Sequence, residues 1–447
     1  MHPHAPAPDV RPRRTRRTVR SAVAALALGT VMFTAGAVGL SPGDDGQKPA
    51  SGPAAPPPAR GSIEALRARV KHLPGDAGAW AALGMAYVQQ ARTLPDPAAY
   101  ARAEQALDRS LAVQKDGNAN AEIAMGALAA ARHDFPTALT WARRATTTAP
   151  YSSVAYGVLA DAYTQLGRYD DSYTAVQRMN DLRPDASALA RASYTFELRG
   201  DTERARELMQ RSLTAAATTG EQSFARVCLS ALYLQDGDAR GALAQADQGL
   251  RTTPGDSALL EARARARTAL GDSPGAVRDY EAAIAVVPLP HYLLGLGELQ
   301  ESLGHRAEAD TQYALLRAQD AIRRTGNTPA DTDAILFEAD HGSPARAADM
   351  GEESLRTRPF IAVHDAYAWA LHQAGRDEQA LTQADQALAL GTHSALFHYH
   401  RAVIRHALGD EAGADDDLRT ALRLDPHFHP LHAPAARVLL QQIDTTS

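Results

Sequence analysis

The sequence is nearly devoid of cysteine: Cys228 is its single thiol in 447 residues. One thiol forms no internal disulfide, and a metal site built on cysteines is excluded as well. Cys228 lies in the apolar run Val227-Cys228-Leu229, where we expect a buried, unreactive side chain. No cysteine follows the apolar segment near the N-terminus, which excludes a lipid anchor of the bacterial lipoprotein type.

Motifs of common enzymes are not expected either, since we identify no G-x-S-x-G elbow, no H-E-x-x-H, no P-loop and no C-x-x-C. The 46 basic and 52 acidic residues leave a net charge of −6, without the basic excess of nucleic-acid-binding proteins. Paired carboxylates occur, but nothing in the sequence places two of them in a cleft. We therefore predict no catalysis, no cofactor and no nucleic-acid partner.

The N-terminal part of the chain, up to Arg60, differs from the rest. Residues 1–20 are basic, residues 21–40 carry no charge, and residues 41–60 are rich in Pro, Ala and Gly. About 20 uncharged residues match the roughly 30 Å hydrocarbon core of a bilayer, and the arginines before them should stay on the cytoplasmic side. The segment is either an uncleaved signal anchor or a signal peptide cleaved after Ala37. Both alternatives place the remaining chain outside the cytoplasmic membrane, at the end of a semi-rigid linker.

From residue 63 onward the chain has helical periodicity, and its prolines repeat at a fixed distance. The interval from Pro150 to Pro184 equals that from Pro254 to Pro288, and at about 34 residues it is the length of a helix-turn-helix repeat. A two-helix unit of this length cannot bury its apolar faces alone and must stack on copies of itself. Small residues where two helices cross keep the same register, at alanines 242, 276, 309, 347, 380 and 414.

One unit carries a nearly complete signature. Trp80, Leu83, Gly84 and Tyr87 follow the pattern W-x2-L-G-x2-Y, and the chain resembles the tetratricopeptide repeat family. The resemblance implies an all-α, right-handed solenoid of about ten repeats over residues 61–426, with a capping helix and tail at 427–447. Together with the abundant Ala, Arg and Gly, the N-terminal layout is typical of a high-GC bacterium.

Some positions depart from the repeat pattern. Charged residues occupy slots that are usually apolar, at Glu122, Arg226, Arg263 and Arg267, and they make local packing less certain there. An insertion is expected around residues 93–99 and a weaker joint at residues 323–331. The acidic run at residues 415–417 is interpreted as a solvated helical face.

The resemblance further implies that the first helices of the units line a groove which binds a protein or peptide. Carried over unit by unit, the groove residues are Asp161, Gln165, Arg191, Glu261, Arg265, Glu298, Asp365, Trp369, His372, Tyr399 and His406. Trp369 and Tyr399 are expected to be exposed anchors for the partner. The alternative is that imperfect stacking buries part of this set.

Histidines concentrate near the C-terminus. His364, His398 and His432 recur at the same interval as the prolines, which predicts one shared slot in successive units. Packing rings are the simplest interpretation, and pH sensing is an alternative. A Zn²⁺ or Ni²⁺ site is a further alternative, with His398, His400, His427 and His429 as candidate ligands. The expected function is a non-catalytic interaction scaffold outside the cytoplasmic membrane, and the rival is a histidine-rich metal-handling accessory protein.

Overall fold

The computed structural model of the protein describes residues 62–93, 97–325 and 329–446. The basic segment, the uncharged segment and the linker, at residues 1–60, lie outside the described residues, as does the cleavage position at Ala37. Within the described ranges, every helix is either too short or too polar to cross a bilayer.

The described part of the chain contains 22 helices and no strand. Twenty of the helices form ten consecutive pairs, with α1 (Ile63–His72) before them and α22 (His432–Thr446) after them. The pairs are α2(Ala77–Thr93)/α3(Pro97–Val113), α4(Ala119–Ala131)/α5(Phe135–Thr148), α6(Ser153–Gln165)/α7(Tyr169–Leu182), α8(Ala186–Glu197)/α9(Thr202–Ala215), α10(Thr219–Gln235)/α11(Ala239–Thr252), α12(Ser257–Ala269)/α13(Ser273–Val286), α14(Pro290–Ser302)/α15(Arg306–Thr325), α16(Thr332–His341)/α17(Pro344–Thr357), α18(Ile361–Gln373)/α19(Asp377–Leu388) and α20(Ala395–Ala407)/α21(Glu411–Leu424). The predicted all-α solenoid of tetratricopeptide-like helix pairs is confirmed.

Each pair is built from signals that the sequence repeats. In α6/α7, the Ser152 hydroxyl accepts a hydrogen bond from the Ala155 amide and starts the first helix. Gly167 ends it with a φ of 66°, a left-handed conformation that suits glycine. Alanines at the crossing points, such as Ala242 and Ala276, are fully buried and allow the two helices to approach closely.

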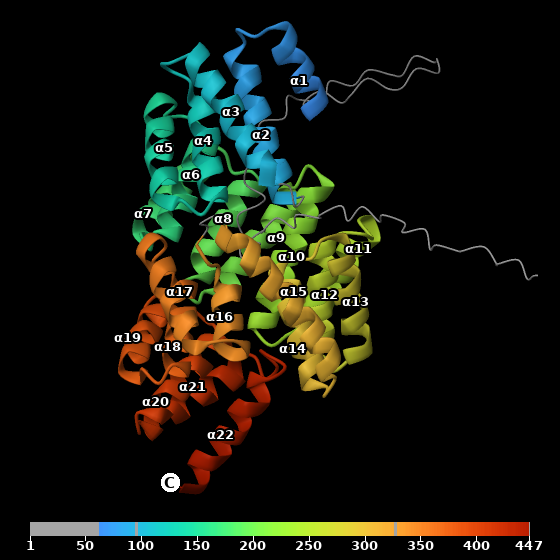
Figure 1. Ribbon diagram of the computed structural model, residues 1–447, viewed down its shortest axis with the longest axis vertical. Coiled ribbons are helices and arrows are strands. Elements are labelled where there is room, and N and C mark those ends of the chain that lie inside the picture. Colours follow the sequence, from blue (N-terminus) through green and yellow to red (C-terminus); the bar gives the residue numbers. More distant parts are fainter. Residues whose placement is uncertain (1–61, 94–96, 326–328, 447) are drawn as a thin grey trace, which may run out of the picture.

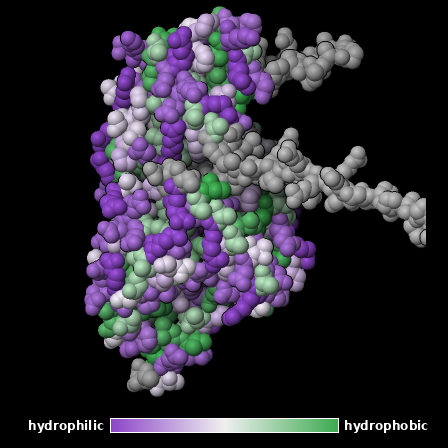
Figure 2. Space-filling view, in the orientation of Figure 1, coloured by the Kyte–Doolittle hydropathy of each residue, from purple (hydrophilic) through white to green (hydrophobic). Residues whose placement is uncertain are grey.

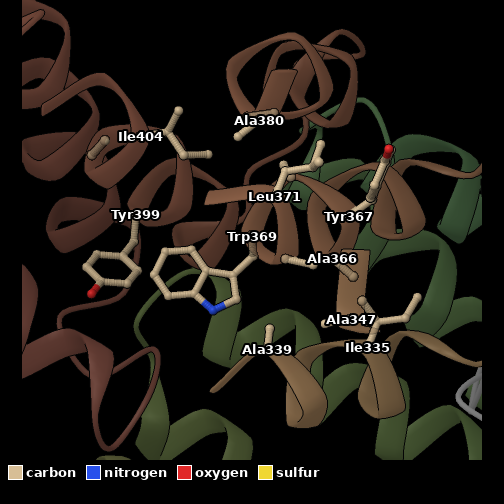
Figure 3. Close-up of a cluster of buried hydrophobic side chains, with 14 of the residues drawn as sticks. Ile335, Ala339, Ala347, Ala366, Tyr367, Trp369, Leu371, Ala380, Tyr399 and Ile404 are labelled. Atoms are coloured by element: carbon tan, nitrogen blue, oxygen red, sulfur yellow. The ribbon is translucent and has the colours of Figure 1, made fainter. Parts of the chain in front are cut away.

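The glycine of the family signature shows how close these crossings are. A Cβ atom on Gly84 would lie 2.5 Å from the Leu107 side chain of the paired helix. Real atoms do not approach so closely, so any larger residue would push α2 and α3 apart. Hydrophobic side chains fill the remaining interface in each pair, and Figure 3 shows the largest buried cluster, at the C-terminal end.

The charged residues in apolar slots are accommodated by hydrogen bonds and ion pairs with side chains of the neighbouring helix. Glu122 is 1% exposed and accepts a hydrogen bond of 2.6 Å from Arg144. Arg263 and Arg267 both contact Asp279, at 2.7 and 2.9 Å. Arg226 donates instead to two glutamine side chains of α11. Local packing is therefore kept, because each charge meets a partner on the neighbouring helix.

The solenoid winds until later repeats lie against earlier ones. In Figure 1, the orange helix α17 lies next to the ends of α7 and α8. Hydrogen bonds join residues that are far apart in the sequence: Arg358 Nε donates to Gln165 Oε1, the Ile361 amide to the Tyr169 hydroxyl, and the Thr392 hydroxyl to the Leu198 carbonyl. The three bonds span nearly the same stretch of chain, so successive turns of the solenoid meet in one register.

Glycines at the helix-pair turns make this contact possible. A Cβ atom on Gly167 would lie 2.4 Å from the Pro359 carbonyl oxygen, and one on Gly200 would lie 2.2 Å from that of Gly391. Both glycines also have positive φ values, of 66° and 74°. The glycines that end first helices thus have a second role, as the docking points of the next turn.

Candidate functional site

A cavity of about 320 Å³, lined by both polar and apolar side chains, lies among the first helices of five central and C-terminal pairs. Its wall is completed by the segment between α21 and α22, at residues 425–432. The lining residues that carry charge or an imidazole are Glu261, Arg265, His291, Glu298, Asp333, Asp340, His400, Asp425, His427, His429 and His432. First helices supply most of them, as expected for the inner wall of a solenoid.

Three of the predicted groove residues meet in this cavity. Glu261 is buried on α12, and its carboxylate lies 3.8 Å from Arg265 Nε one turn later on the same helix. Glu298 is buried on α14. Burial is the main effect on Glu261 and raises the pKa of its carboxyl, although the charge of Arg265 opposes this shift.

Glu298 is the best-partnered carboxylate of the cavity. His429 Nε2 lies 3.0 Å from one of its oxygens, and His341 Nε2 lies 3.9 Å from the other. Burial by itself raises the pKa of Glu298, but the charge of His429, the nearby His341 ring and the close contact with His429 outweigh burial and lower it to about 2. This ion pair holds the segment before α22 against α14.

Asp340 joins the C-terminal segment to α16 in a similar way. Trp369 Nε1 donates a hydrogen bond of 2.8 Å to Asp340 Oδ1, and His432 Nε2 lies 3.7 Å from the other oxygen. Burial opposes ionisation of Asp340, yet the hydrogen bonds from His432 and Trp369 lower its pKa. The carboxylate is therefore charged and contacts three elements: its own helix, α18 and α22.

His400 is buried between the cavity and the core. Its Nδ1 lies 3.0 and 3.1 Å from the two oxygens of Asp365, and its ring stacks on Trp369 with centroids 4.3 Å apart. The His400 side chain is buried, with 1% of its surface exposed, and its Nε2 has no hydrogen-bond partner among the described residues. An unsatisfied nitrogen in the wall of a cavity is a potential contact for a ligand.

The prediction that Trp369 and Tyr399 are exposed anchors is wrong. They are 3% and 6% exposed, and Figure 3 shows both rings within the buried cluster. Tyr399 packs on Phe428 and His432, at centroid distances of 5.6 and 5.1 Å. The C-terminal segment covers these aromatics, because the chain turns back over the first helices instead of leaving them open.

The other groove candidates lie apart from the cavity. Asp161 and Arg191 form a bidentate ion pair with two distances of 2.7 Å, and Gln165 is buried at the contact with Arg358. His372 lies 2.6 Å from Asp377 at the turn between α18 and α19. His406 occupies the matching turn of the next pair, 2.9 Å from Glu411, and is exposed. These side chains serve the packing of pairs and do not join one surface.

The histidine row is only partly present. His364 and His398 share one slot, and each contacts the second helix of its own pair, at Gln383 (2.8 Å) and Asp417 (2.7 Å). His432 does not continue the row, because α22 begins at this residue whereas α18 and α20 begin before their histidines.

The candidate metal ligands do not converge. His398 faces Asp417, while His400, His427 and His429 line the cavity, where the His427 amide donates to Asp425 at 2.8 Å. Across the described ranges, no three or more His, Cys, Asp or Glu side chains are arranged to hold a metal ion.

The statement that the chain has no G-x-S-x-G pattern is wrong, although the pattern that is present has a structural role. Residues 271–275 read Gly-Asp-Ser-Pro-Gly and fit the G-x-S-x-G pattern of a hydrolase nucleophile. They form the turn between α12 and α13, where the Asp272 carboxylate accepts a hydrogen bond from the Gly275 amide. A helix precedes this turn in place of the strand that a nucleophile elbow requires.

Comparison with known proteins gives only structural neighbours. No family model and no curated protein matches the chain. Among solved structures, PilF of Pseudomonas aeruginosa is 17% identical with a TM-score of 0.38, and the match covers 50% of this chain and 97% of PilF. A tetratricopeptide repeat protein of Parabacteroides merdae is 18% identical (TM-score 0.34; 58% and 98% covered), and human IFIT1 is 13% identical (TM-score 0.45; 81% and 86% covered). The likeness is one of repeat fold.

Proposed function

We propose that this protein is a non-catalytic scaffold that binds a protein or peptide partner through the inner wall of its solenoid. The observation that carries the proposal is the convergence of charged side chains from α12, α14, α16 and α20 on one cavity. Stacked repeats bury their packing faces, and polar residues gathered around a cavity of the inner wall are available for recognition.

The chemistry of the cavity supports binding more than catalysis. Its lining residues include neither serine nor cysteine, among the residues that the structure describes. Cys228 is buried elsewhere, and burial raises the pKa of its thiol well above the usual range. Glu298 and Asp340 each lie beside a histidine, and the pKa of each carboxyl is lowered, which favours its charged form and does not prepare it to exchange protons near neutral pH.

On the face of the molecule that Figure 2 shows, the described residues form no comparable feature. Figure 2 shows one face of the molecule, on which hydrophilic residues dominate and hydrophobic residues lie in scattered small groups. Isolated apolar side chains are normal on a soluble surface and do not mark an interface. A partner is therefore expected to contact the inner wall.

Photo-crosslinking tests this proposal directly. A benzophenone amino acid replaces Arg265 at the cavity, and in a matched protein it replaces Glu207, an exposed residue of α9. Irradiation of cells that express the full chain should give a defined protein adduct from position 265 and none from position 207. The same adduct from both positions, or none from position 265, contradicts an inner-wall partner.

We further propose that the repeats lie outside the cytoplasmic membrane, with residues 21–40 as the signal anchor or signal peptide. The uncharged stretch behind six arginines supports this orientation. A C-terminal epitope tag on the full chain should be digested by protease added to intact spheroplasts, while a cytoplasmic control protein stays protected. A tag that is digested only after lysis contradicts the proposal.

A further inference from the structure

We propose that the cavity binds an organic cation with several N–H donors, such as a guanidinium or a primary ammonium group. The inference concerns the ligand of the cavity and goes beyond the scaffold role, since it does not require that the cation belong to a protein. Three observations support it: the carboxylates of the cavity wall, a buried histidine nitrogen without a hydrogen-bond donor, and the size and apolar lining of the cavity.

The charge of the cavity wall favours a cation. Its carboxylates are Glu261, Glu298, Asp333, Asp340 and Asp425, and its one arginine is Arg265. The Arg265 guanidinium is half exposed and lies beside Glu261. An anionic ligand would have to approach these acids at short range in a partly desolvated space, which opposes its binding.

His400 provides the second, independent observation. Both oxygens of Asp365 accept from its Nδ1, so the ring carries a hydrogen on that nitrogen. In the neutral ring, Nε2 then presents a lone pair, and it has no donor among the described residues. A buried acceptor in the cavity wall is satisfied by a ligand that donates a hydrogen bond.

Asp333 and Glu261 are the carboxylates of the cavity that can still accept hydrogen bonds from a ligand. The Asp333 side chain makes no hydrogen bond or ion pair within the described residues, and the Glu261 side chain has only the long contact with Arg265. Burial, followed by the charges of Asp331 and Glu298, raises the pKa of Asp333 to about 8. A bound cation would favour the ionised form of Asp333, whereas Glu298 and Asp340 already have histidine partners.

The size and the apolar part of the cavity limit the ligand to a small molecule or a single side chain. About 320 Å³ is at the lower end of ligand-binding pockets, which span roughly 300–1,000 Å³. Leu294, Leu336 and Phe428 also line the space and can pack on an alkyl chain. A guanidinium or ammonium group on a short aliphatic chain combines both properties, and agmatine, which carries one of each, is a suitable probe.

Titration calorimetry with agmatine on the purified full chain in mild detergent tests the inference. We expect one site per chain, weakened at least tenfold by Asp333→Asn and by Glu261→Gln, each made separately. The matched controls are Asp349→Asn and Glu207→Gln, which make the same changes on exposed positions of α17 and α9. Glutarate, a dianion of similar length, should give no heat of binding.

The outcomes are separable. Absence of agmatine binding by a chain whose circular dichroism is fully helical overturns the inference, as does binding that both cavity variants retain. A second titration uses the peptide acetyl-Gly-Gly-Arg-Gly-Gly-amide: tighter binding than agmatine assigns the cation to a protein partner, and weaker binding assigns it to a free amine. Cation binding without a crosslink from position 265 supports this inference and contradicts the scaffold proposal. A crosslink from position 265 without cation binding supports the scaffold proposal and contradicts this inference.

Discussion

Two repeats, α12/α13 and α20/α21, contain the same polar network at corresponding positions. Arg263 and Arg267 contact Asp279 in the first repeat, and Arg401 and Arg405 contact Asp417 in the second. Even the auxiliary contacts match, since Arg263 also reaches Asp247 and Arg401 reaches Asp385, at 3.2 and 3.1 Å. Both central aspartates are buried, at 4% and 1% exposure.

The same two repeats differ on their inner wall. Glu261 and Ala262 of the first correspond to Tyr399 and His400 of the second, in the register that aligns Arg263 with Arg401. The polar network of the second repeat has one additional residue, His398, which is hydrogen-bonded to Asp417. The first repeat has Leu260 at the corresponding position. Contacts within a helix pair are thus reused, while residues that face the interior are particular to each repeat.

The largest effect is expected at the shared aspartates. Asp417→Ala leaves two partly buried arginines without their carboxylate and should lower the free energy of unfolding by about 4 kcal/mol. Asp279→Ala should cost somewhat less, about 3 kcal/mol, because one partner fewer is stranded. Guanidinium chloride unfolding followed by circular dichroism measures both. A loss under about 1 kcal/mol for either variant, the range of exposed ion pairs, would show that the network does not stabilise the pair.

Glu298→Gln tests the cavity wall instead of the pair. Because the pKa of Glu298 is lowered to about 2 from 4.5, its ionised form stabilises the fold above the unfolded pKa, and this stability is lost as the pH falls from 4.5 through 2. The variant should be less stable than the parent by about 2 kcal/mol at pH 7, allowing for partial screening. Urea unfolding at pH 7, 4 and 3 should show the difference shrinking, and a constant difference would contradict the ion-pair explanation.

Asp333→Asn should stabilise the fold, in contrast to Glu298→Gln. The raised pKa of Asp333, about 8, means that its ionisation destabilises the fold, so the stability it contributes is present below the unfolded pKa of 3.8 and is lost as the pH rises through 8. The variant should be more stable than the parent at pH 9, by about 1 kcal/mol, and nearly equal to it at pH 3. Unfolding at the two pH values checks this, and a variant less stable at pH 9 refutes the assignment.

The smallest effect is expected from making the two networks identical. His398→Leu copies Leu260 into the second repeat and removes one hydrogen bond to Asp417, which keeps both arginines. An apolar replacement of similar volume offsets much of that loss, so the change should stay within about 1 kcal/mol. A loss above about 2 kcal/mol in the same unfolding assay, more than such an offset hydrogen bond contributes, would show that His398 is an essential member.

Several features could be predicted from the sequence, because they depend on residues that lie close along the chain. Two-helix units were expected, and a glycine such as Gly167, with a φ of 66°, ends the first helix of a unit. Cys228 was expected to be buried, and it is 2% exposed. A capping helix and tail were expected at residues 427–447, and α22 covers His432–Thr446. Periodicity and capping encode these features locally.

Asp417 shows where a local interpretation is insufficient. The acidic run at residues 415–417 was interpreted as a solvated face, yet Asp417 is 1% exposed and, of the three aspartates, Asp416 alone is exposed. In hindsight, the arginines at 401 and 405 mark its partner face, since residues four apart lie on one side of a helix. A charge in an apolar slot can therefore be interpreted only together with the slot opposite to it on the paired helix.

The sequence by itself determined the period, the helix pairs and the networks inside each pair, because a repeat contacts mainly its neighbours and its own residues specify those contacts. Only the tertiary structure decided which inner-wall residues meet. Small rotations accumulate over successive repeats until Gln165 reaches Arg358 and His429 reaches Glu298. No single repeat encodes that sum, and for this reason the burial of Trp369 and the formation of the cavity were not apparent from the residues alone.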